Sequence, residues 1–576
     1  MDLVFDIETD DLKATKIHCL VAQDVDSGTL YKYPPDKLQE GYELLSKANK
    51  LIGHNIIGFD IPMIEKFGDV KLSHKPVIDT LVMSRLFNPV REGGHSLEKW
   101  GFRLGFKKID FDDYQNYSNE MLTYCTRDVQ LNTVLFHHLR KEGTGFNKDC
   151  VALEQDVARV IKEQEVNGFK FDLEKAELIL AELRQKMQEA EDEVHKVFKP
   201  KMIDIREVTP KLKKDGTLSK QGLTEEEYNE RLTTNNIKPF MRRKLQDFNL
   251  GSRKQIGEYL IEFGWKPKKF TPTGQPIVDE TTLAHIKNIP QAKLIAEYLL
   301  YQKRIAQIDS WIDAVEEDGR VHGFVIPNGT ITGRMSHRKP NMAQVPNIHS
   351  PYGSECRSCW TVEDNYNLLG VDASSLELRM LAHYMQDEEF INEIINGDIH
   401  TSNQKSAGLE SRDQAKTFIY ALIYGAGDSK LGKVVGGNQA DGKRLREQFF
   451  NNKPSFKSLR DKVQRASGKH WLKGIDGRKL LIRTQHAALN TLLQGGGAIV
   501  MKRGLVMLDA LINLNSLDAR FVGNIHDEWQ IEVREDLSDF VGKLAVECII
   551  KAGEHYNLRC PMDGEYKVGR NWSETH

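Results

Sequence analysis

Two acidic residues far apart in the chain are the first candidates for chemistry. Asp372 ends an apolar run, 368–371, after which a helical pattern of apolar residues begins. Asp527 lies between two strand-like runs, 521–525 and 529–533, where a tight turn would place it at a hairpin tip. Two carboxylates that meet in the fold can share a pair of Mg²⁺ ions, which phosphoryl transfer needs about 3.5–4 Å apart. We therefore expect Asp372 and Asp527 to form one metal site.

A second acidic group begins at the N-terminus. The segment 3–9 alternates like a strand, which places Asp6 and Glu8 on one face. Carboxylates on an inner face cost free energy unless they are paired, so a metal ion is the natural partner. An edge strand with a solvated face would explain the same pair, and the two residues alone do not separate these interpretations.

Three further residues extend this group. Asp60 precedes an apolar helix start, and Tyr124 and Asp128 are four positions apart, on one face of a predicted helix. Together with Asp6 and Glu8 these carboxylates can hold metal ions, while the tyrosine can orient a water molecule against a phosphodiester.

A basic and aromatic stripe is predicted on one helix. Arg412, Lys416, Tyr420 and Tyr424 recur every four residues and therefore lie along one side of a helix, about 18 Å from end to end. Two cations followed by two aromatic rings suit a triphosphate and a base with its sugar. His400 can add a further phosphate contact. Aromatic residues at helical spacing are usually core residues, but a core position does not explain the two cations.

Composition and charge restrict the class of protein. A chain of 576 residues is too long for one core, so we expect two to four domains. The net charge of -3 argues weakly against a nucleic-acid partner, although the distribution of charge decides this question. Seven scattered cysteines predict a reducing compartment, and the lone pair Cys356 and Cys359 predicts no zinc site. No long apolar run or signal pattern is present, so we expect no membrane partner.

The middle of the chain predicts long helices and an irregular segment. A helix is predicted over 151–164, with Asn167 and Gly168 as the stop signal after it. A helix of about 25 residues follows Asp172. We expect loops and short helices over 199–247. Ser252 predicts a helix cap, whose free N–H groups would either face a phosphate or belong to a plain surface helix.

The N-terminal set resembles a known nuclease family. In order and spacing, the carboxylates and Tyr124 resemble the DEDD proofreading exonucleases, in the subgroup with tyrosine in the third motif. The resemblance implies a mixed RNase H-like sheet surrounded by helices, and 3′→5′ hydrolysis of single-stranded DNA ends.

Three later segments extend the resemblance over most of the chain. Residues 372–379, 412–425 and 526–528 resemble motifs A, B and C of family A, DNA polymerase I-like, DNA polymerases. Within that family, segments such as 523–533 are most similar to the replicative polymerases of T-seven-like podophages. This implies a DNA-directed DNA polymerase, a nucleotidyltransferase that extends a primer and proofreads it, and a role in replication of a phage genome.

The resemblance also implies a multidomain α/β architecture with a right-hand polymerase. The implied parts are an exonuclease domain over 1–148, a helical thumb over 149–305, an antiparallel-sheet palm over 306–395 and 489–576, and helical fingers over 396–488.

Residue roles follow from the matched motifs. The implied metal ligands are Asp6, Glu8, Asp60, Asp128, Asp372, the Ala373 carbonyl and Asp527. The implied nucleotide-binding residues are Glu377, which excludes a 2′-hydroxyl, His400, Arg412, Lys416, Tyr420 beside the sugar, and Tyr424 at the templating position. The implied minor-groove contacts are Arg334, Asn490, Gln494 and His526. Lys416 would also protonate the leaving pyrophosphate, and Glu528 would support the metal pair.

Cofactors and partners are implied in the same way. Each of the two sites would hold two Mg²⁺ ions, which Mn²⁺ can replace. The substrates would be primer–template DNA and dNTPs, and the partners a phage helicase–primase and a single-strand-binding protein in the cytoplasm of an infected bacterium. The phage relatives recruit a host thioredoxin through an insertion at the thumb tip. The stretch 199–248 is short and does not resemble that insertion, so we do not expect thioredoxin binding.

Three alternatives are weighed against this hypothesis. An RNA polymerase or reverse transcriptase would share the palm, but Glu377 and the exonuclease motifs argue against it. A non-catalytic replication factor would not need paired metal ligands. A bacterial repair polymerase is disfavoured because no 5′-nuclease segment precedes Met1.

Overall fold

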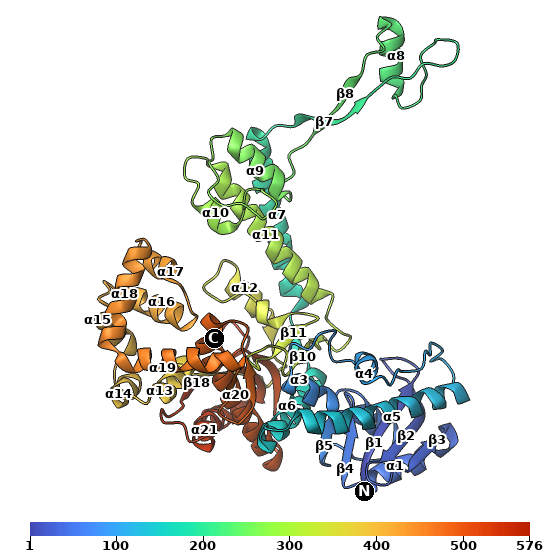
Figure 1. The fold of residues 1–576 in the computed structure, drawn as a ribbon, viewed down its shortest axis with the longest axis vertical. Helices are drawn as coiled ribbons and strands as arrows, with labels where there is room; N and C mark the ends of the chain where they lie inside the picture. Colours follow the sequence, from blue (N-terminus) through green and yellow to red (C-terminus); the bar gives the residue numbers. More distant parts are fainter. The chain divides into compact units, whose positions relative to one another are not determined.

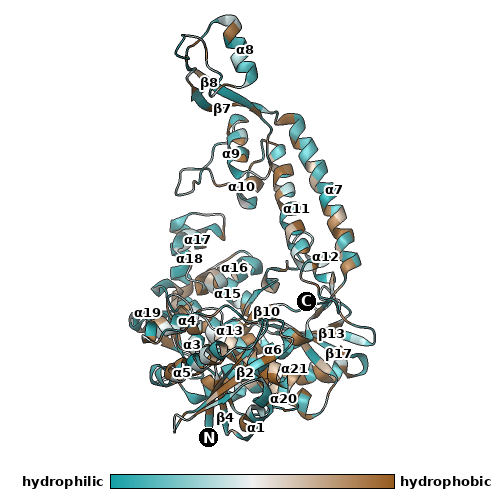
Figure 2. Ribbon diagram, turned by 90° about the vertical axis from the view of Figure 1, so that its right-hand side faces the viewer, coloured by the Kyte–Doolittle hydropathy of each residue, from teal (hydrophilic) through white to brown (hydrophobic). Residues whose placement is uncertain are grey.

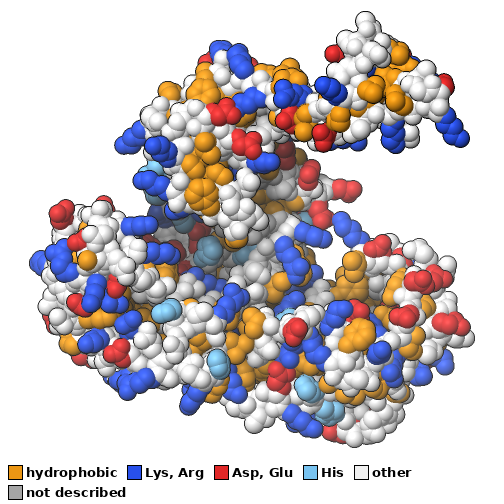
Figure 3. All heavy atoms as spheres, turned by 45° about the horizontal axis from the view of Figure 1, so that its top comes forward, with side chains coloured by type: hydrophobic (Ala, Val, Ile, Leu, Met, Phe, Trp, Pro, Cys, Tyr) orange, Lys and Arg blue, Asp and Glu red, His pale blue; other side chains and the backbone are white. Residues whose placement is uncertain are grey.

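The computed structural model describes residues 1–576, except for the side chain of Thr281, and it divides into two compact units (Figure 1). The larger unit comprises Met1–Asp172 and Ala314–His576, and the smaller unit comprises Leu173–Asp313. Among the helices described, none combines the length and the apolar character that crossing a membrane requires. In the view of Figure 3, basic and acidic side chains are interspersed over the surface.

The N-terminal part of the larger unit is built on a five-stranded mixed sheet with the order β3-β2-β1-β4-β5. The central strand β1 is antiparallel to β2 and parallel to β4. The strands are β1 (Asp2–Thr9), β2 (Ile17–Asp24), β3 (Leu30–Tyr33), β4 (Lys50–Gly53) and β5 (Val77–Asp79). The surrounding helices are α1 (Leu38–Lys47), α2 (Asp60–Phe67), α3 (Thr80–Phe87), α4 (Leu97–Leu104) and α5 (Asn119–Glu142). This is the mixed sheet with surrounding helices that the family resemblance implies.

The alternation of β1 decides which helix its acidic residues face. Leu3 and Phe5 share one core cluster with residues of α1 and α2, whereas Val4 shares another with Cys125 and Val129 of α5. Side chains two positions apart point to the same face of a strand. Asp6 and Glu8 therefore face α5, the helix that carries Tyr124 and Asp128.

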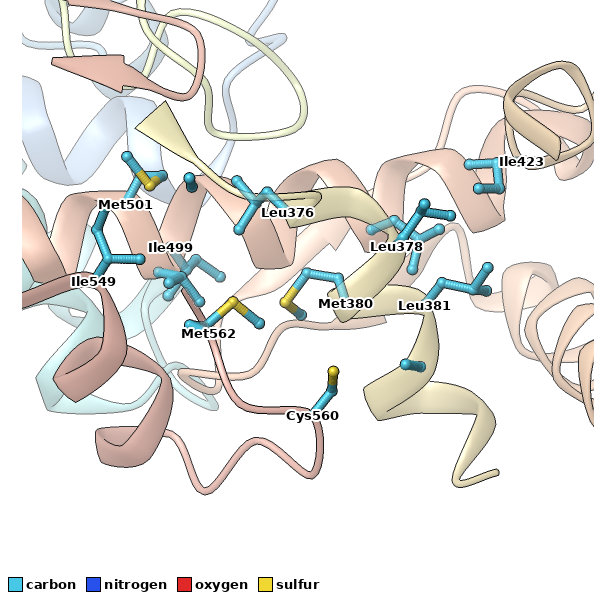
Figure 4. Close-up of a cluster of buried hydrophobic side chains, with 14 of the residues drawn as sticks. Leu376, Leu378, Met380, Leu381, Ile423, Ile499, Met501, Ile549, Cys560 and Met562 are labelled. Atoms are coloured by element: carbon cyan, nitrogen blue, oxygen red, sulfur yellow. The ribbon is translucent and has the colours of Figure 1, made fainter. Parts of the chain in front are cut away.

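The C-terminal part of the larger unit contains a four-stranded antiparallel sheet with the order β16-β17-β13-β18. Its strands are β13 (Tyr366–Ala373), β16 (Ala519–Ile525), β17 (Glu528–Arg534) and β18 (Gly564–Gly569). The helices packed with it are α13 (Leu376–Met385), α20 (Ala488–Leu514) and α21 (Ser538–His555). The sheet and helices share the main hydrophobic core, part of which is drawn in Figure 4.

Glycines in α20 let α13 approach closely. A Cβ atom at Gly496 would lie 2.3 Å from Met380, and one at Gly497 would lie 3.0 Å from Leu376. A glycine inside a helix costs roughly 1 kcal/mol relative to alanine, so the close contact accounts for these positions. The contact fixes α13 directly after the strand that ends near Asp372.

A helical region follows α13 in the chain. It contains α14 (Glu388–Asn396), α15 (Ile399–Ala407), α16 (Arg412–Ile423), α17 (Asp428–Lys433), α18 (Gln439–Asn452), α19 (Pro454–Ala466) and the hairpin β14 (Trp471–Lys473) with β15 (Lys479–Leu481). The rings of Phe418 and Phe456 each lie within 6 Å of that of Phe449, at 5.6 and 5.5 Å between centroids. This aromatic core holds α16 against α18 and α19.

One long helix, α6, and several short elements join these parts. They are α6 (Lys148–Asn167), β6 (Phe169–Phe171), β9 (Arg320–Val321), β10 (Phe324–Ile326), β11 (Ser336–Arg338), α12 (Gly353–Ser358), β12 (Trp360–Thr361) and the 3-10 turns 35–37, 342–344, 467–469, 485–487 and 535–537. The helix α6 belongs to the larger unit, and the smaller unit begins at Leu173. A buried ion cluster contributes to this placement: Glu154 of α6 bonds to Arg478 at 2.6 Å and Lys502 at 2.8 Å.

The smaller unit is a long helical pair with an elongated hairpin. Its elements are α7 (Leu173–Val197), β7 (Lys201–Val208), α8 (Glu225–Thr234), β8 (Phe240–Gln246), α9 (Arg253–Glu262), α10 (Glu280–Ala284) and α11 (Gln291–Ile312). Hydrophobic and hydrophilic segments alternate along α7 in Figure 2, as its predicted solvated face requires. The paired strands β7 and β8 correct the expectation of loops and short helices over 199–247. Arg242 of β8 binds Glu227 and so attaches α8 to the ribbon.

Candidate active sites

The palm sheet brings Asp372 and Asp527 to one end. The antiparallel register pairs Asp372 with Glu528, and the Ala373 amide donates to the Asp527 carbonyl at 3.3 Å. Asp527 lies in the turn between β16 and β17, where His526 has a φ of 56°. Partial desolvation, followed by the charges of Asp527 and Glu528, raises the pKa of Asp372 to about 7. Two carboxylates and a carbonyl are hard oxygen donors, so this set fits Mg²⁺.

Glu528 is fixed by residues that sequence reasoning missed. Its carboxylate accepts from the Trp572 indole at 2.7 Å and lies 2.8 Å from His576 Nδ1, and it also accepts from Gln530. Burial alone would raise the pKa of Glu528, but these bonds and the charge of His576 lower it below its usual value. Trp572 and His576 carry no local pattern in the sequence, because their partner is more than 40 positions away.

Arg334 and Glu377 connect the palm to the basic and aromatic helix. The Arg334 guanidinium lies 3.2 Å from Glu377 Oε1 and 3.4 Å from Asp527 Oδ1. The Tyr424 hydroxyl donates to Glu377 Oε2 at 2.9 Å. Four residues that the sequence analysis selected from separate segments thus form one cluster.

The predicted stripe is present on α16. Arg412 and Lys416 are exposed, Tyr420 is half-buried and Tyr424 is 49% exposed, so a core position does not explain the second tyrosine. The ring centroids of Tyr420 and Tyr424 lie 6.2 Å apart, and His400 of α15 lies 6.5 Å from Tyr420. Arg412 forms an ion pair with Asp398 at 2.8 Å, which the sequence did not predict.

Two of the candidate DNA contacts, Asn490 and Gln494, lie on α20. The two residues are one turn apart, and in the described structure the buried Asn490 Oδ1 has no hydrogen-bond partner.

In the smaller unit, Ser252 caps α9 as predicted, by accepting from the Gln255 amide. The neighbouring Arg253 donates to the Val278 carbonyl, which favours a plain capped helix over a phosphate site.

The N-terminal carboxylates meet between β1 and α5. Atoms of Asp6, Glu8 and Cys125 lie within 4.8 Å of one another, and Asp60 Oδ1 accepts from the Ile7 amide at 3.2 Å. Cys125 was not predicted here. Burial raises the pKa of its thiol, so the carboxylates are the better ligands for a hard cation.

Burial and mutual repulsion dominate this cluster. Burial and then the charge of Asp128 raise the pKa of Glu8 to about 9, and burial raises that of Asp60 to about 7. The pKa of Asp6 rises because of burial and then the charge of Asp60. In the described structure, Asp128 Oδ1 is buried without a hydrogen-bond partner. Desolvated carboxylates that raise one another's pKa fit a divalent cation.

Lys108 is a further residue that sequence reasoning missed. Its ammonium lies 2.5 Å from Asp128 Oδ2 and 4.8 Å from the centroid of the Tyr124 ring. It belongs to the irregular segment 105–118, which has no periodic pattern. Only the presence of two adjacent lysines, 107 and 108, marks the position in the sequence.

Comparison with known proteins identifies the family. The model of the family described as DNA polymerase family A matches residues 220–574. The chain is 34% identical to the DNA-directed DNA polymerase of Enterobacteria phage T3 and 32% identical to that of Escherichia phage T7, with 100% of each chain covered. It is 28% identical to DNA polymerase I of Pseudomonas aeruginosa over 58% of this chain and 39% of that one.

A solved structure agrees in fold. The POL domain of Pol1 from M. smegmatis, in complex with DNA primer-template and dNTP, superposes with a TM-score of 0.81 at 19% identity, covering 100% of this chain and 96% of that one. At this identity the likeness concerns the fold alone. From the family match and the full-length similarity to the two phage enzymes, this chain belongs to DNA polymerase family A.

Proposed function

We propose that this chain is a DNA-directed DNA polymerase that adds dNTPs to a primer 3′ end, and that its N-terminal part is a 3′→5′ exonuclease that removes mispaired ends. The observation that carries the first half is the cluster in which Arg334 contacts Glu377 and Asp527 while Tyr424 bonds to Glu377. It joins the three polymerase motifs at one place. The similarity to the T3 and T7 enzymes supports the same function.

In the polymerase site, Asp372, Asp527 and the Ala373 carbonyl would hold two Mg²⁺ ions, or Mn²⁺ in their place. Bound metal would activate the primer 3′-oxygen and offset the charge on the phosphates. Glu528, held by Trp572 and His576, keeps the Asp527 turn in place.

The helix α16 would bind the incoming nucleotide. His400, Arg412 and Lys416 contact the triphosphate, and Lys416 gives a proton to the pyrophosphate as it leaves. Arg412 must exchange Asp398 for phosphate, so an incoming nucleotide changes the partner of this residue. Such exchange fits a helix that closes only when a correct base pair has formed.

Selection of sugar and template would use the residues beside α16. Glu377 closes the space that a 2′-hydroxyl would need, Tyr420 lies beside the sugar, and Tyr424 stacks at the templating position. The contacts to the minor groove near the primer end are Arg334, Asn490, Gln494 and His526.

In the N-terminal site, two metal ions would be held by Asp6, Glu8, Asp60 and Asp128. Tyr124 would orient the water molecule that attacks the terminal phosphodiester. The raised pKa values of Asp6, Glu8 and Asp60 support the assignment, because a bound cation would offset the burial that raises all three and the mutual repulsion that also raises those of Asp6 and Glu8.

We also propose the biological setting. The chain replicates a phage genome in the cytoplasm of an infected bacterium, with a helicase–primase and a single-strand-binding protein as partners. The unit Leu173–Asp313 would be the thumb. The stretch 199–248 is short and does not resemble the insertion that the family resemblance associates with thioredoxin, so we propose replication without thioredoxin.

Primer extension tests the polymerase function. A labelled primer on a DNA template is incubated with Mg²⁺ and either dNTPs or rNTPs, with EDTA as the metal-free control. Extension with dNTPs that EDTA abolishes supports the proposal. Preferred use of rNTPs would favour an RNA polymerase, and binding of the DNA without extension would favour a non-catalytic factor. A primer with a mismatched 3′ end, incubated without nucleotides, tests the exonuclease.

A further inference from the structure

We propose that Lys108 is a built-in competitor of the metal ions in the N-terminal carboxylate cluster and sets the metal concentration that this site requires. The inference rests on the exonuclease function proposed above. It concerns a residue that belongs to none of the sequence motifs.

The contact itself is close and sheltered. The Lys108 ammonium lies 2.5 Å from Asp128 Oδ2, and the two side chains are 22% and 5% exposed. The ammonium also lies 4.8 Å from the centroid of the Tyr124 ring, an arrangement that favours a cation. A partly desolvated ion pair is screened far less by salt than a pair on the surface. Lys108 is therefore a fixed part of the site and not a surface charge that happens to be near it.

One end of the segment 105–118 is fastened by the neighbour of Asp128. The Arg127 side chain donates from Nε to the Lys107 carbonyl at 2.8 Å, and its guanidinium lies 3.6 Å from the centroid of the Phe106 ring. Residues adjacent to Asp128 and to Lys108 are thus bonded to each other. This clamp sets the register that brings the ammonium to the carboxylate.

The other end is fastened to the site through aromatic contacts. The Phe111 ring stacks on Tyr124 at 5.3 Å between centroids, and Tyr114 meets the same ring edge-on at 6.3 Å. His18 Nε2 lies 3.0 Å from the Tyr114 carbonyl oxygen, which ties this end to strand β2. The segment is anchored on both sides of Lys108.

The charges explain why such a cation would compete. Asp6, Glu8, Asp60 and Asp128 are buried or half-buried carboxyl groups, and Lys108 places one positive charge against Asp128 before any metal ion binds. The ammonium contacts Oδ2 of Asp128. In the described structure the buried Oδ1 has no hydrogen-bond partner, so it is the oxygen left for a metal ion. Two cations at one carboxylate repel each other strongly where water is excluded. A metal ion at Asp128 must therefore push the ammonium away or bind against its charge.

Metal binding measured without catalysis gives the direct test. Asp372→Asn with Asp527→Asn removes the polymerase ligands from the full-length chain, and Mn²⁺ binding is then followed by electron paramagnetic resonance. We expect Lys108→Met and Lys108→Gln in this background to bind Mn²⁺ about tenfold more tightly, because one competing charge is gone. Lys108→Arg keeps the charge, and Lys107→Met removes an exposed lysine next to it, so both should stay within about twofold of the parent.

Mg²⁺ dependence of 3′-end trimming by the chain with its polymerase ligands intact gives a second readout. Lys108→Met should reach half-maximal trimming at about one tenth of the parent's Mg²⁺ concentration. One result would overturn the role of Lys108 and leave the exonuclease proposal standing. In that result both neutral variants bind Mn²⁺ no more tightly than the parent, while the Asp6→Asn control loses the binding. Mn²⁺ binding that Asp6→Asn does not reduce would overturn the exonuclease site, and Lys108's role with it.

Discussion

His576 Nδ1 lies 2.8 Å from Glu528 Oε2, so a residue at the far end of the chain fixes the carboxylate next to Asp527. The Trp572 indole holds the other oxygen at 2.7 Å, and the Arg357 guanidinium lies 4.3 Å from the centroid of a Trp572 ring. The turn that carries Asp527 is thereby braced from a segment outside the three polymerase motifs. Replacing the brace should change the polymerase reaction alone.

We expect His576→Ala to lower the rate of primer extension about tenfold, because one bond to a buried carboxylate is worth about 1.5–3 kcal/mol. Trimming of a 3′ end should stay unchanged, since the N-terminal cluster shares no contact with this residue in the described structure. His555→Ala removes an exposed histidine and is the matched control. Single-turnover rates for both reactions check this, and an equal loss of both would contradict it.

Tyr420 should govern the use of dideoxynucleotides. It is half-buried on α16 beside His400, where its hydroxyl can replace the missing sugar 3′-hydroxyl as a hydrogen-bond donor. We expect the chain to accept dideoxynucleotides readily, and Tyr420→Phe to discriminate against them by about 10–100-fold. The ratio of termination to extension measures this, with dNTP use by the same variant as the control. Identical termination by the two forms would refute the assignment.

The ion cluster at Glu154 should contribute strongly to the free energy of unfolding. Glu154, Arg478 and Lys502 are at most 3% exposed in their side chains, and burial lowers the pKa of Lys502 to about 8. Glu154→Gln removes the ion-pair partner of the buried Lys502, while Arg478 keeps Asp476 at 2.7 Å, and the loss costs about 3–5 kcal/mol. Denaturant midpoints should fall accordingly, whereas Glu43→Gln, from an exposed pair, should cost less than about 1 kcal/mol. Equal midpoints for the two variants would contradict the role of the cluster.

Glu8 should make the metal-free chain less stable as the pH rises. Its pKa is raised to about 9 in the folded chain, mainly by burial and then by Asp128, against about 4.3 when unfolded. The folded chain therefore binds the extra proton between these values, and stability falls as the pH rises through this window.

In EDTA, we expect the thermal midpoint to drop between pH 5 and pH 9, and Glu8→Gln to be more stable by a few degrees at pH 8. Added Mg²⁺ should restore the parent and have less effect on the variant. Differential scanning fluorimetry checks this, and a parent midpoint that falls no more between pH 5 and pH 9 than the midpoint of Glu8→Gln would contradict it.

Periodic and locally capped elements were predictable from the sequence, and contacts between distant segments were not. The strand with Asp6, the turn with Asp527 and the helix from Arg412 all follow from spacing, and the structure has each of them. Lys108 lies in a segment without a period, and His576 acts on a residue 48 positions away. Sequence spacing has no signal for either contact.

Two features of residues 148–246 also had no signal in the sequence. The strands β7 and β8 mix charged and apolar residues and include a bulge between Asp204 and Arg206, so their alternation is weak. The helix α6 belongs to the larger unit, and the ion partners of its Glu154 are 324 and 348 positions away in the chain. Neither fact can be read from a local pattern.

The central claim is that two separate carboxylate sites perform two reactions on one DNA end. The most direct measurement compares Asp527→Ala and Asp6→Ala on one labelled primer–template, scoring extension with dNTPs and trimming without them. Asp527→Ala should abolish extension and leave trimming nearly intact, and Asp6→Ala should do the reverse. Loss of both activities in either folded variant would contradict the two-site account.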